Sequence, residues 1–322
     1  MLSEAAPAAW DDLTLSEREY KRAAARYRRR RSLRAYAFLA PYLVPFLIFM
    51  VVPVCWGIGL SFFEGGLVGP ATWVGLKNWR EISSDTELLT SARNTAVYAV
   101  EAIVLVFFLA IGLAMLLNRY GRGSNVFKLA LYFPLLAPAV LVGLIWQFLT
   151  NYDFGFLNLV LDGLGFKRAN LLGDSTLALW VIVLAEVWRG LGFWTLYYLA
   201  SLQNIPSELL DAARVDGAKG VKRFARVTLP IMRPLLLFAV VIAIIANFQV
   251  FDTVYIMTQG GPSNSTSTVV WFIWKRLFLF QQTGQAYAAS VALLLAILLL
   301  TGLAFGVLGR RRGGFRFRRA PE

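Results

Sequence analysis

Hydrophobic residues are gathered into six long segments that alternate with shorter polar stretches. A helix of about 20 predominantly apolar residues crosses the hydrocarbon core of a bilayer, and each segment reaches that length. The pattern therefore predicts an all-α polytopic membrane protein with six transmembrane helices. They are expected near residues 37–62, 92–117, 128–149, 176–200, 231–257 and 285–308.

The composition agrees with this class. Of the 322 residues, 58% are hydrophobic and only 16% are charged, and the mean hydropathy is +0.60. A soluble domain would carry roughly a quarter charged residues. The chain has no histidine, and its one cysteine, Cys55, lies in the first apolar segment. These counts exclude a histidine proton relay and a disulfide within the chain, and they leave little chemistry for a membrane-embedded enzyme.

Lysine and arginine are distributed unevenly. Of 32 such residues, nine precede the first apolar segment, three lie in 118–128, six lie in 201–233 and six follow residue 309. Positive charge in alternate loops marks the cytoplasmic side of a membrane protein. We therefore expect a basic, partly disordered cytoplasmic tail at 1–34, a six-span domain at 35–309 and a basic cytoplasmic tail at 310–322. The basic runs are expected to contact membrane lipids and not nucleic acid.

The loop at 201–230 is charged and helix-forming, although it joins two apolar segments. It contains the stretch DAARVDGAKGVKRFARVTLP, Asp211–Pro230. Ser207, Glu208 and Asp211 occupy positions where a helix N-terminus favours caps and negative charge, and Gly217 suits the position after a helix C-terminus. On these features alone, an ordinary amphipathic loop helix stays open as an alternative.

Several blocks of the chain resemble one family of membrane proteins. The stretch from Asp211 resembles the EAA loop of ABC-importer permeases, which docks onto an ATPase. The other blocks resemble sugar-type ABC permeases: VGLKNW (74–79), ARNTAVYAV (92–100), WRGLGFWTLYYLASLQNIPSELLDAARVDGA (188–218), RFARVTLPIMRP (223–234) and FDTVYIMTQGGPSNST (251–266). The resemblance covers about residues 35–310. It implies the type I ABC-importer permease fold with cytoplasmic coupling helices, in the binding-protein-dependent carbohydrate group of the maltose, trehalose and glycerol-3-phosphate importers.

The resemblance implies a non-catalytic subunit, the first of two paired permeases, in the prokaryotic plasma membrane. The implied cargo is a sugar, either a di- or oligosaccharide or a sugar-phosphate-like solute. The implied partners are a second homologous permease, two ATPase subunits, an extracytoplasmic solute-binding protein and the sugar. No G-x-x-x-x-G-K-[ST] sequence occurs, so we expect no cofactor in this chain and ATP with magnesium on the partner ATPase. The residues implied to couple to the ATPase are Glu208, Asp211, Ala212, Ala213, Gly217, Leu229 and Pro230.

Two features depart from the family pattern. Asp211 stands where the family usually has glutamate, so its carboxylate reaches about one methylene less far toward the ATPase. Glu208 could share the role of forming an ion pair with the ATPase. The chain also lacks the very large outer loop of the enteric maltose permease. Maltose specificity therefore does not carry over with the fold.

Polar and aromatic residues in the fourth and fifth spans are candidates for the substrate path. At 100° per residue, one stripe of the fifth span holds Asn247, Phe251, Asp252 and Tyr255. Hydroxyl partners together with aromatic faces suit a sugar, but polar side chains also join membrane helices to one another, so both interpretations stay open. Trp194 and Tyr197 are further stacking candidates in the fourth span.

Other polar residues within the spans carry the same two alternatives. Glu186 and Arg189, three residues apart, could form a structural ion pair or contact substrate, and Gln147 could belong to a helix seam or to the path. Intramembrane carboxylates also keep open a different class of protein, a stand-alone ion-coupled secondary transporter. Six spans would then require dimerisation, and no strong internal repeat occurs.

Overall fold

The structure is a computed structural model that describes residues 26–27, 36–65, 70–120 and 125–309. The predicted tails therefore lie outside the described residues, apart from Arg26 and Tyr27. The chain divides into two compact units, Met1–Gly59 and Leu60–Glu322. The described part of the first unit is an apolar helical segment with a π-helical turn η1 (Leu47–Val51), followed by α2 (Val52–Leu60).

The predicted spans are confirmed. Five helical segments are long and apolar enough to cross a membrane, and a bent pair of shorter helices makes a sixth. The five are Tyr36–Leu60, Thr86–Arg119, Ala178–Gln203, Arg233–Met257 and Thr283–Leu308, and the bent pair is Asn125–Leu136 with Ala139–Thr150.

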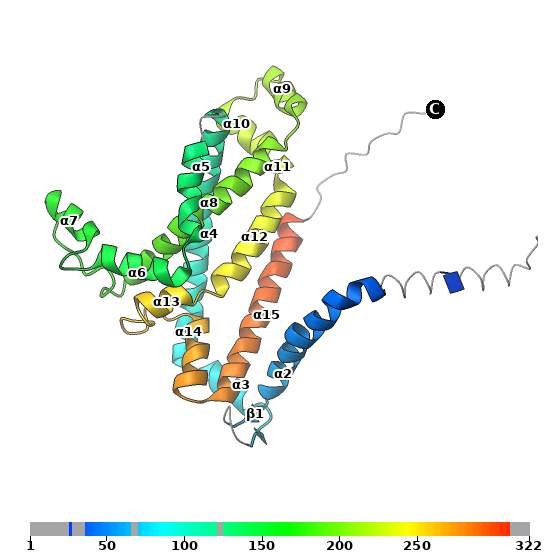
Figure 1. The fold of residues 1–322 in the computed structure, drawn as a ribbon, viewed down its shortest axis with the longest axis vertical. Coiled ribbons are helices and arrows are strands. Elements are labelled where there is room, and N and C mark those ends of the chain that lie inside the picture. Colours follow the sequence, from blue (N-terminus) through cyan, green and yellow to red (C-terminus); the bar gives the residue numbers. More distant parts are fainter. Residues whose placement is uncertain (1–25, 28–35, 66–69, 121–124, 310–322) are drawn as a thin grey trace, which may run out of the picture. The chain divides into compact units, whose positions relative to one another are not determined.

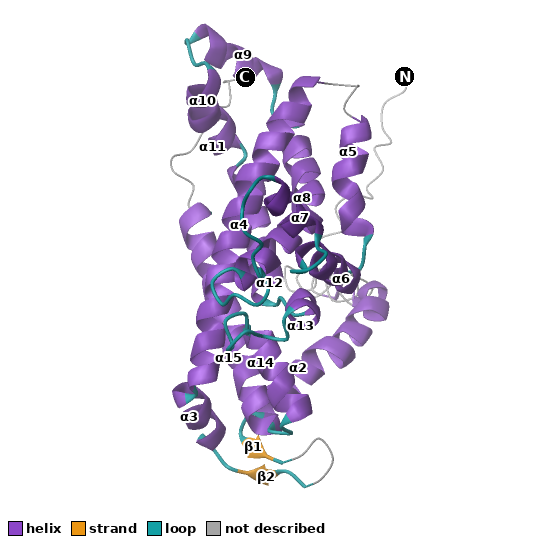
Figure 2. Cartoon of the chain, turned by 90° about the vertical axis from the view of Figure 1, so that its left-hand side faces the viewer, coloured by secondary structure: helices purple, strands orange, loops and turns teal. Residues whose placement is uncertain are grey.

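The second unit is built from helices with one short antiparallel hairpin. A set of long helices runs between two ends of this unit, and Figures 1 and 2 show α9 and α10 at one end and α3 and β1 at the opposite end. The elements are β1 (Phe63–Glu64), β2 (Thr72–Trp73), α3 (Lys77–Ser84), α4 (Thr86–Tyr120), α5 (Asn125–Tyr132), the 3₁₀ turn η3 (Phe133–Leu136), α6 (Ala139–Thr150), α7 (Phe156–Gly163), α8 (Ala178–Gln203), α9 (Ser207–Val215), α10 (Gly220–Arg223), the π turn η4 (Phe224–Thr228), α11 (Leu229–Ile231), α12 (Arg233–Phe248), α13 (Asp252–Met257), α14 (Val269–Trp274), the π turn η5 (Lys275–Leu279) and α15 (Thr283–Leu308).

Two spans are broken within the apolar region. In the third span, α5 and η3 meet α6 at a bend of 100°. Pro134 lies in the first turn of η3 and Pro138 is the N-cap of α6, and proline cannot donate the backbone hydrogen bond that a continuous helix needs. The fifth span is interrupted between α12 and α13, where Phe251 has φ −140° and ψ −56°. Both breaks would leave backbone groups without partners if they faced lipid.

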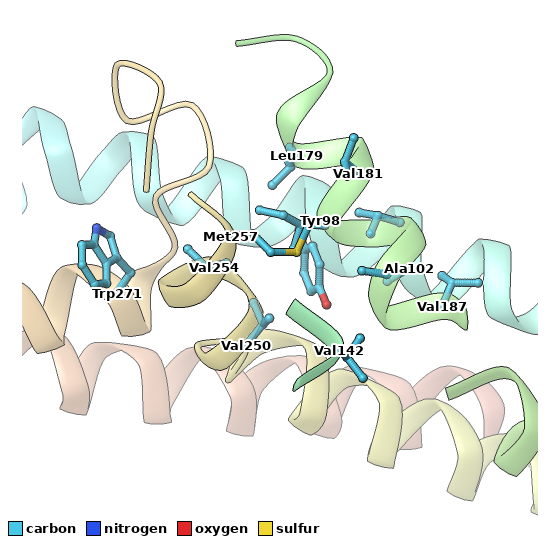
Figure 3. Packing of buried hydrophobic residues seen from close by; sticks show 13 residues of the cluster. Tyr98, Ala102, Val142, Leu179, Val181, Val187, Val250, Val254, Met257 and Trp271 are labelled. Atoms are coloured by element: carbon cyan, nitrogen blue, oxygen red, sulfur yellow. The ribbon is translucent and has the colours of Figure 1, made fainter. Parts of the chain in front are cut away.

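The two broken spans pack against each other around a common core. The Gln147 amide on α6 donates hydrogen bonds to the carbonyl oxygens of Ile256 (2.6 Å) and Met257 (3.3 Å), which lie at the C-terminal end of α13. Gln147 therefore lies in a helix seam. Within the common core, Tyr98 of α4 is 1% exposed, and Figure 3 shows its ring surrounded by side chains from α6, α8 and α13.

Buried charges join two helices at the end that carries α3. Arg276 in η5 donates to Asp85 at 2.5 Å, and Lys275 bonds Glu87. The carboxylate of Asp85 also accepts the backbone N–H groups of Glu87 and Leu88, which caps the start of α4. The four charged side chains are only about 15% exposed. Removing one partner of such a pair would leave a partly buried charge uncompensated, so the group fixes α4 against η5.

Gly192 in α8 allows the backbone of α5, in the third span, to pack closely against α8. A Cβ atom at this position would lie 2.0 Å from the Leu131 carbonyl oxygen and 2.7 Å from the Tyr132 Cα atom. We expect Gly192→Ala to destabilise the protein by about 1–3 kcal/mol, because rigid backbone has to move. The measurement is the midpoint of thermal unfolding in detergent. Gly190→Ala is the control, since its added Cβ would meet only Trp194 at 3.7 Å; equal midpoints for the two variants would contradict the close approach.

Candidate functional site

The loop between α8 and α12 forms two short helical parts at one end of the second unit (Figure 1). Pro206 is the N-cap of α9, and no side chain caps this helix, so the expected cap at Ser207 does not form. Glu208 lies in the first turn, as expected. Asp211 accepts a hydrogen bond from Arg214 at 2.7 Å, and both of these side chains are more than half exposed.

Gly217 ends α9 with the geometry predicted for the residue after a helix C-terminus. Its φ is +75°, in the left-handed region that glycine favours. The Gly217 N–H donates to the Arg214 carbonyl at 3.0 Å, and the Ala218 N–H donates to the Ala213 carbonyl at 2.9 Å. These two bonds define a Schellman motif, which satisfies carbonyl groups left free at the helix end. Nothing lies within 4 Å of a Cβ built at Gly217, so only the backbone conformation restricts this position.

The two alanines of α9 differ in exposure. Ala213 is buried, whereas Ala212 is exposed. Exposed apolar side chains accompany Ala212: Leu209 is 48% exposed and Val215 is 89% exposed. Beyond Gly217, Leu229 packs against the core of the bundle, and Pro230 lies in the first turn of α11. One side of the loop is therefore anchored, and the other presents carboxylates and apolar groups.

A second candidate region is a cavity of about 250 Å³ between α4, α6, α8 and the break of the fifth span. Backbone that leaves the helical path is tolerated at membrane depth where it lines such a cavity. Charged and amide groups in the lining are Glu186, Arg189, Asn247, Gln249 and Asp252, and its aromatic groups are Tyr98, Phe193, Trp194 and Phe251.

Four of the six predicted path residues line this cavity: Trp194, Asn247, Phe251 and Asp252. The other two lie elsewhere. The Tyr197 hydroxyl donates to the Leu235 carbonyl at 2.7 Å, and its ring stacks on Phe238, which joins α8 to α12. The Tyr255 ring packs among Phe251, Trp271 and Trp274. The break before Asp252 ends the helical stripe, which is why Tyr255 turns away from the cavity.

The carboxylate of Glu186 and the guanidinium of Arg189 form an ion pair that lines the cavity. The Arg189 Nη2 and Nε atoms lie 2.7 Å and 2.9 Å from one Glu186 oxygen. Arg189 is thus held by Glu186, while no hydrogen bond or ion pair reaches the carboxylate of Asp252 from the described residues. The Asn247 amide nitrogen donates to the Ala243 carbonyl, which leaves the oxygen of that amide free to accept.

Sequence reasoning missed Tyr98, Phe193 and Gln249 as lining residues. Tyr98 and Phe193 lie in apolar runs, where an aromatic residue predicts packing. Gln249 falls outside the predicted stripe because that stripe assumes an unbroken helix, whereas the structure has a break at this point. Within the described residues, no group of three or more histidine, cysteine or carboxylate side chains could hold a metal ion. The lining groups can bind hydroxyls and stack on ring faces, but they do not form a nucleophile–base arrangement.

Comparison with known proteins places this architecture in a family. Residues 103–313 match the family described as binding-protein-dependent transport system inner membrane component. The chain is 33% identical to the probable ABC transporter permease protein YesP of Bacillus subtilis, over 86% of this chain and 91% of that protein. It is 32% identical to the trehalose/maltose transport system permease protein MalF of Thermococcus litoralis, over 73% of this chain and 80% of that protein.

A solved structure supports the same fold. The crystal structure of a bacterial ABC transporter involved in the import of the acidic polysaccharide alginate matches with a TM-score of 0.77 and 22% identity, over 88% of this chain and 98% of that chain. The likeness confirms the predicted type I permease fold, and the matches offer no support for a stand-alone secondary transporter. The chain is a multi-pass membrane protein that belongs to the family of inner membrane permease components of binding-protein-dependent ABC transport systems.

Proposed function

We propose that this chain is one of two paired permeases in an ATP-driven importer of a sugar. The observation that carries the proposal is the α9–Gly217–α10 loop, which presents Glu208, Asp211 and exposed apolar side chains on its outer side. Carboxylates with apolar neighbours on a short rigid helix suit docking into a basic-rimmed cleft of another protein. The partner is an ATPase subunit, because the chain itself has no phosphate-binding loop.

The coupling residues divide into two roles. Glu208, Asp211 and Ala212 contact the ATPase from the exposed side of the loop. Ala213, Gly217, Leu229 and Pro230 hold the loop against the bundle, so that movement of the docked ATPase reaches the spans. ATP and magnesium bind to the two ATPase subunits, and this chain performs no catalysis.

The cavity lined by Trp194, Asn247, Phe251 and Asp252 is this chain's part of the sugar path. Its amide and carboxylate oxygens accept hydrogen bonds from sugar hydroxyls, and the aromatic faces stack on the apolar face of a ring. Its volume is below the roughly 300–1,000 Å³ of ordinary ligand pockets, so it holds part of a di- or oligosaccharide. Relatives named for trehalose, maltose and arabinooligosaccharides support a sugar as the cargo.

The remaining partners and the orientation complete the proposal. An extracytoplasmic binding protein delivers the sugar, and a second homologous permease supplies the opposite wall of the path. The distribution of lysine and arginine supports a topology in the prokaryotic inner membrane. In this topology the loop at 201–230, the tail at 1–34 and the tail at 310–322 lie in the cytoplasm. The six-span domain at 35–309 then lies between the two tails.

Reversing the charge of the coupling helix tests the docking. We expect Glu208→Lys with Asp211→Lys to abolish co-purification of the ATPase, because two cations replace the two carboxylates on the docking side. The measurement is quantitative mass spectrometry of the complex purified through a tag on this chain, in mild detergent. The control is Asp153→Lys with Asp162→Lys, an equal charge change on exposed residues around α7. Full retention of the ATPase by the Glu208 and Asp211 variant would refute the assignment.

Substitution of Gly217 tests the backbone of the same loop. A left-handed conformation costs a residue with a Cβ atom roughly 1–2 kcal/mol, and asparagine tolerates it better than alanine or valine. We expect ATPase activity stimulated by the sugar-loaded binding protein to fall in the order Gly, Asn, Ala, Val. Because there is open space around Gly217, side-chain size alone predicts no loss. A Gly217→Val variant with wild-type activity would show that the turn is dispensable.

Substitution in the cavity tests the path. We expect Asn247→Ala and Asp252→Ala each to reduce sugar transported per ATP hydrolysed by several-fold, since a lost hydrogen bond to a sugar hydroxyl is worth about 0.5–1.5 kcal/mol. Uptake of labelled sugar into proteoliposomes, normalised to ATP hydrolysis, is the measurement. Asn125→Ala, at an exposed position in α5, is the control. Unchanged coupling ratios in both cavity variants would remove these residues from the path.

A further inference from the structure

A second cavity lies between the bundle and the loop at 201–230, here called the coupling loop, on the anchored side of that loop. Its volume is about 430 Å³, larger than that of the proposed sugar path. It is formed where α4 and α8 end and where α9, α10 and η4 fold back over them. Nothing in the proposed import cycle requires a cavity at this place.

The lining has two distinct parts. Its floor is apolar, with Met115, Leu202, Ile205, Leu210 and Phe224. Its polar rim contains three arginines, Arg119, Arg214 and Arg223, and no carboxylate belongs to the lining. A pocket with an apolar floor and a cationic rim fits an amphiphile that carries negative charge.

The charge of this rim is largely uncompensated. Arg214 pairs with Asp211, which lies outside the lining, at 2.7 Å. The guanidinium groups of Arg119 and Arg223 have no hydrogen bond or ion pair with any of the described residues. Guanidinium groups bind phosphate oxygens through two parallel hydrogen bonds, and they repel one another when no anion is present. An anion in the pocket would therefore stabilise this arrangement.

The position of the cavity in the bundle indicates which class of anion would bind there. Arg119 lies at the end of the α4 span, and Leu202 lies next to the end of the α8 span. The ends of spans are where a membrane protein meets lipid headgroups. Basic residues close to an anionic membrane surface are attracted to its headgroups. We propose that this cavity binds an acidic phospholipid, with the phosphate on the three arginines and the first part of an acyl chain on the apolar floor.

Such a lipid would join parts of the protein that otherwise meet only through a few contacts. Arg119 belongs to a span, whereas Arg214 and Arg223 belong to the coupling loop. A phosphate bound by all three would hold the loop at a set position relative to α4. Acidic lipid would then raise the ATPase activity of the assembled transporter by favouring a loop position that fits the ATPase.

The test compares two double variants in the full-length chain, purified with the subunits that accompany it. In the first, Arg119→Gln and Arg223→Gln remove the two unpaired arginines of the rim. The matched control, Lys222→Gln with Arg226→Gln, removes the same charge from the same end of the protein at positions outside the lining. Phosphatidylglycerol retained after detergent exchange is counted by native mass spectrometry, and the ATPase rate is measured in vesicles with and without phosphatidylglycerol.

The proposal expects wild type and control to retain phosphatidylglycerol, and the rim variant to lose it together with at least half of the stimulation by this lipid. Equal retention in the rim variant and the control would overturn the proposal. Inorganic phosphate that displaces the lipid and restores the full rate would also overturn it, in favour of a free anion. Loss of the ATPase subunit with lipid retention unchanged would assign the arginines to ATPase docking instead. Because retention is counted on the permease, failure of the proposed coupling would leave this readout intact.

Discussion

A backbone that leaves the helical path inside a bilayer has to find partners for its freed groups, and this constraint sets the arrangement of the bundle. Pro134 and Pro138 force a 100° bend in the third span, and the fifth span breaks between α12 and α13. One broken span supplies hydrogen bonds to the other, because Gln147 on α6 donates to carbonyl groups at the end of α13. The cavity with Asn247 and Asp252 lies at the break of the fifth span. Polar groups thus gather where the backbone is irregular.

The spans could be predicted from the sequence to within six residues at each end, because a long apolar segment is what a membrane crossing requires. Gly217 was also predictable, since a glycine that follows a helical stretch has one favoured role. The cavity was only partly predictable. A helical wheel assumes a continuous helix, so it placed Tyr255 with Asn247, although the break turns α13 toward Trp271 and Trp274. The burial of Tyr98 depends on helices distant in sequence, which no local pattern reveals.

The shape of the loop at 201–230 is set by local backbone hydrogen bonds, and its position is set by packing against the bundle. Its Schellman turn needs only Gly217 and two backbone hydrogen bonds, so this turn would form in any context. Its attachment depends on Leu210 and Phe224, which pack against the core cluster formed in part by the ends of α4 and α8. The cationic cavity lies within this attachment. A loop held by so few apolar contacts is sensitive to whatever fills that cavity.

Two continuous helices connect the coupling loop with the polar cavity. In α12, 16 residues run from Arg233, next to the loop, to Phe248 at the break. At 1.5 Å per residue this rod is about 24 Å long. α8 runs in the opposite sense, from Glu186 and Trp194 at the cavity to Gln203 at the loop. A rigid helix that pivots near its middle moves both of its ends. In the proposed complex, displacement of the loop by the ATPase would therefore move Asn247 relative to Trp194 without any change within either helix. The two breaks are where the chain can absorb that motion.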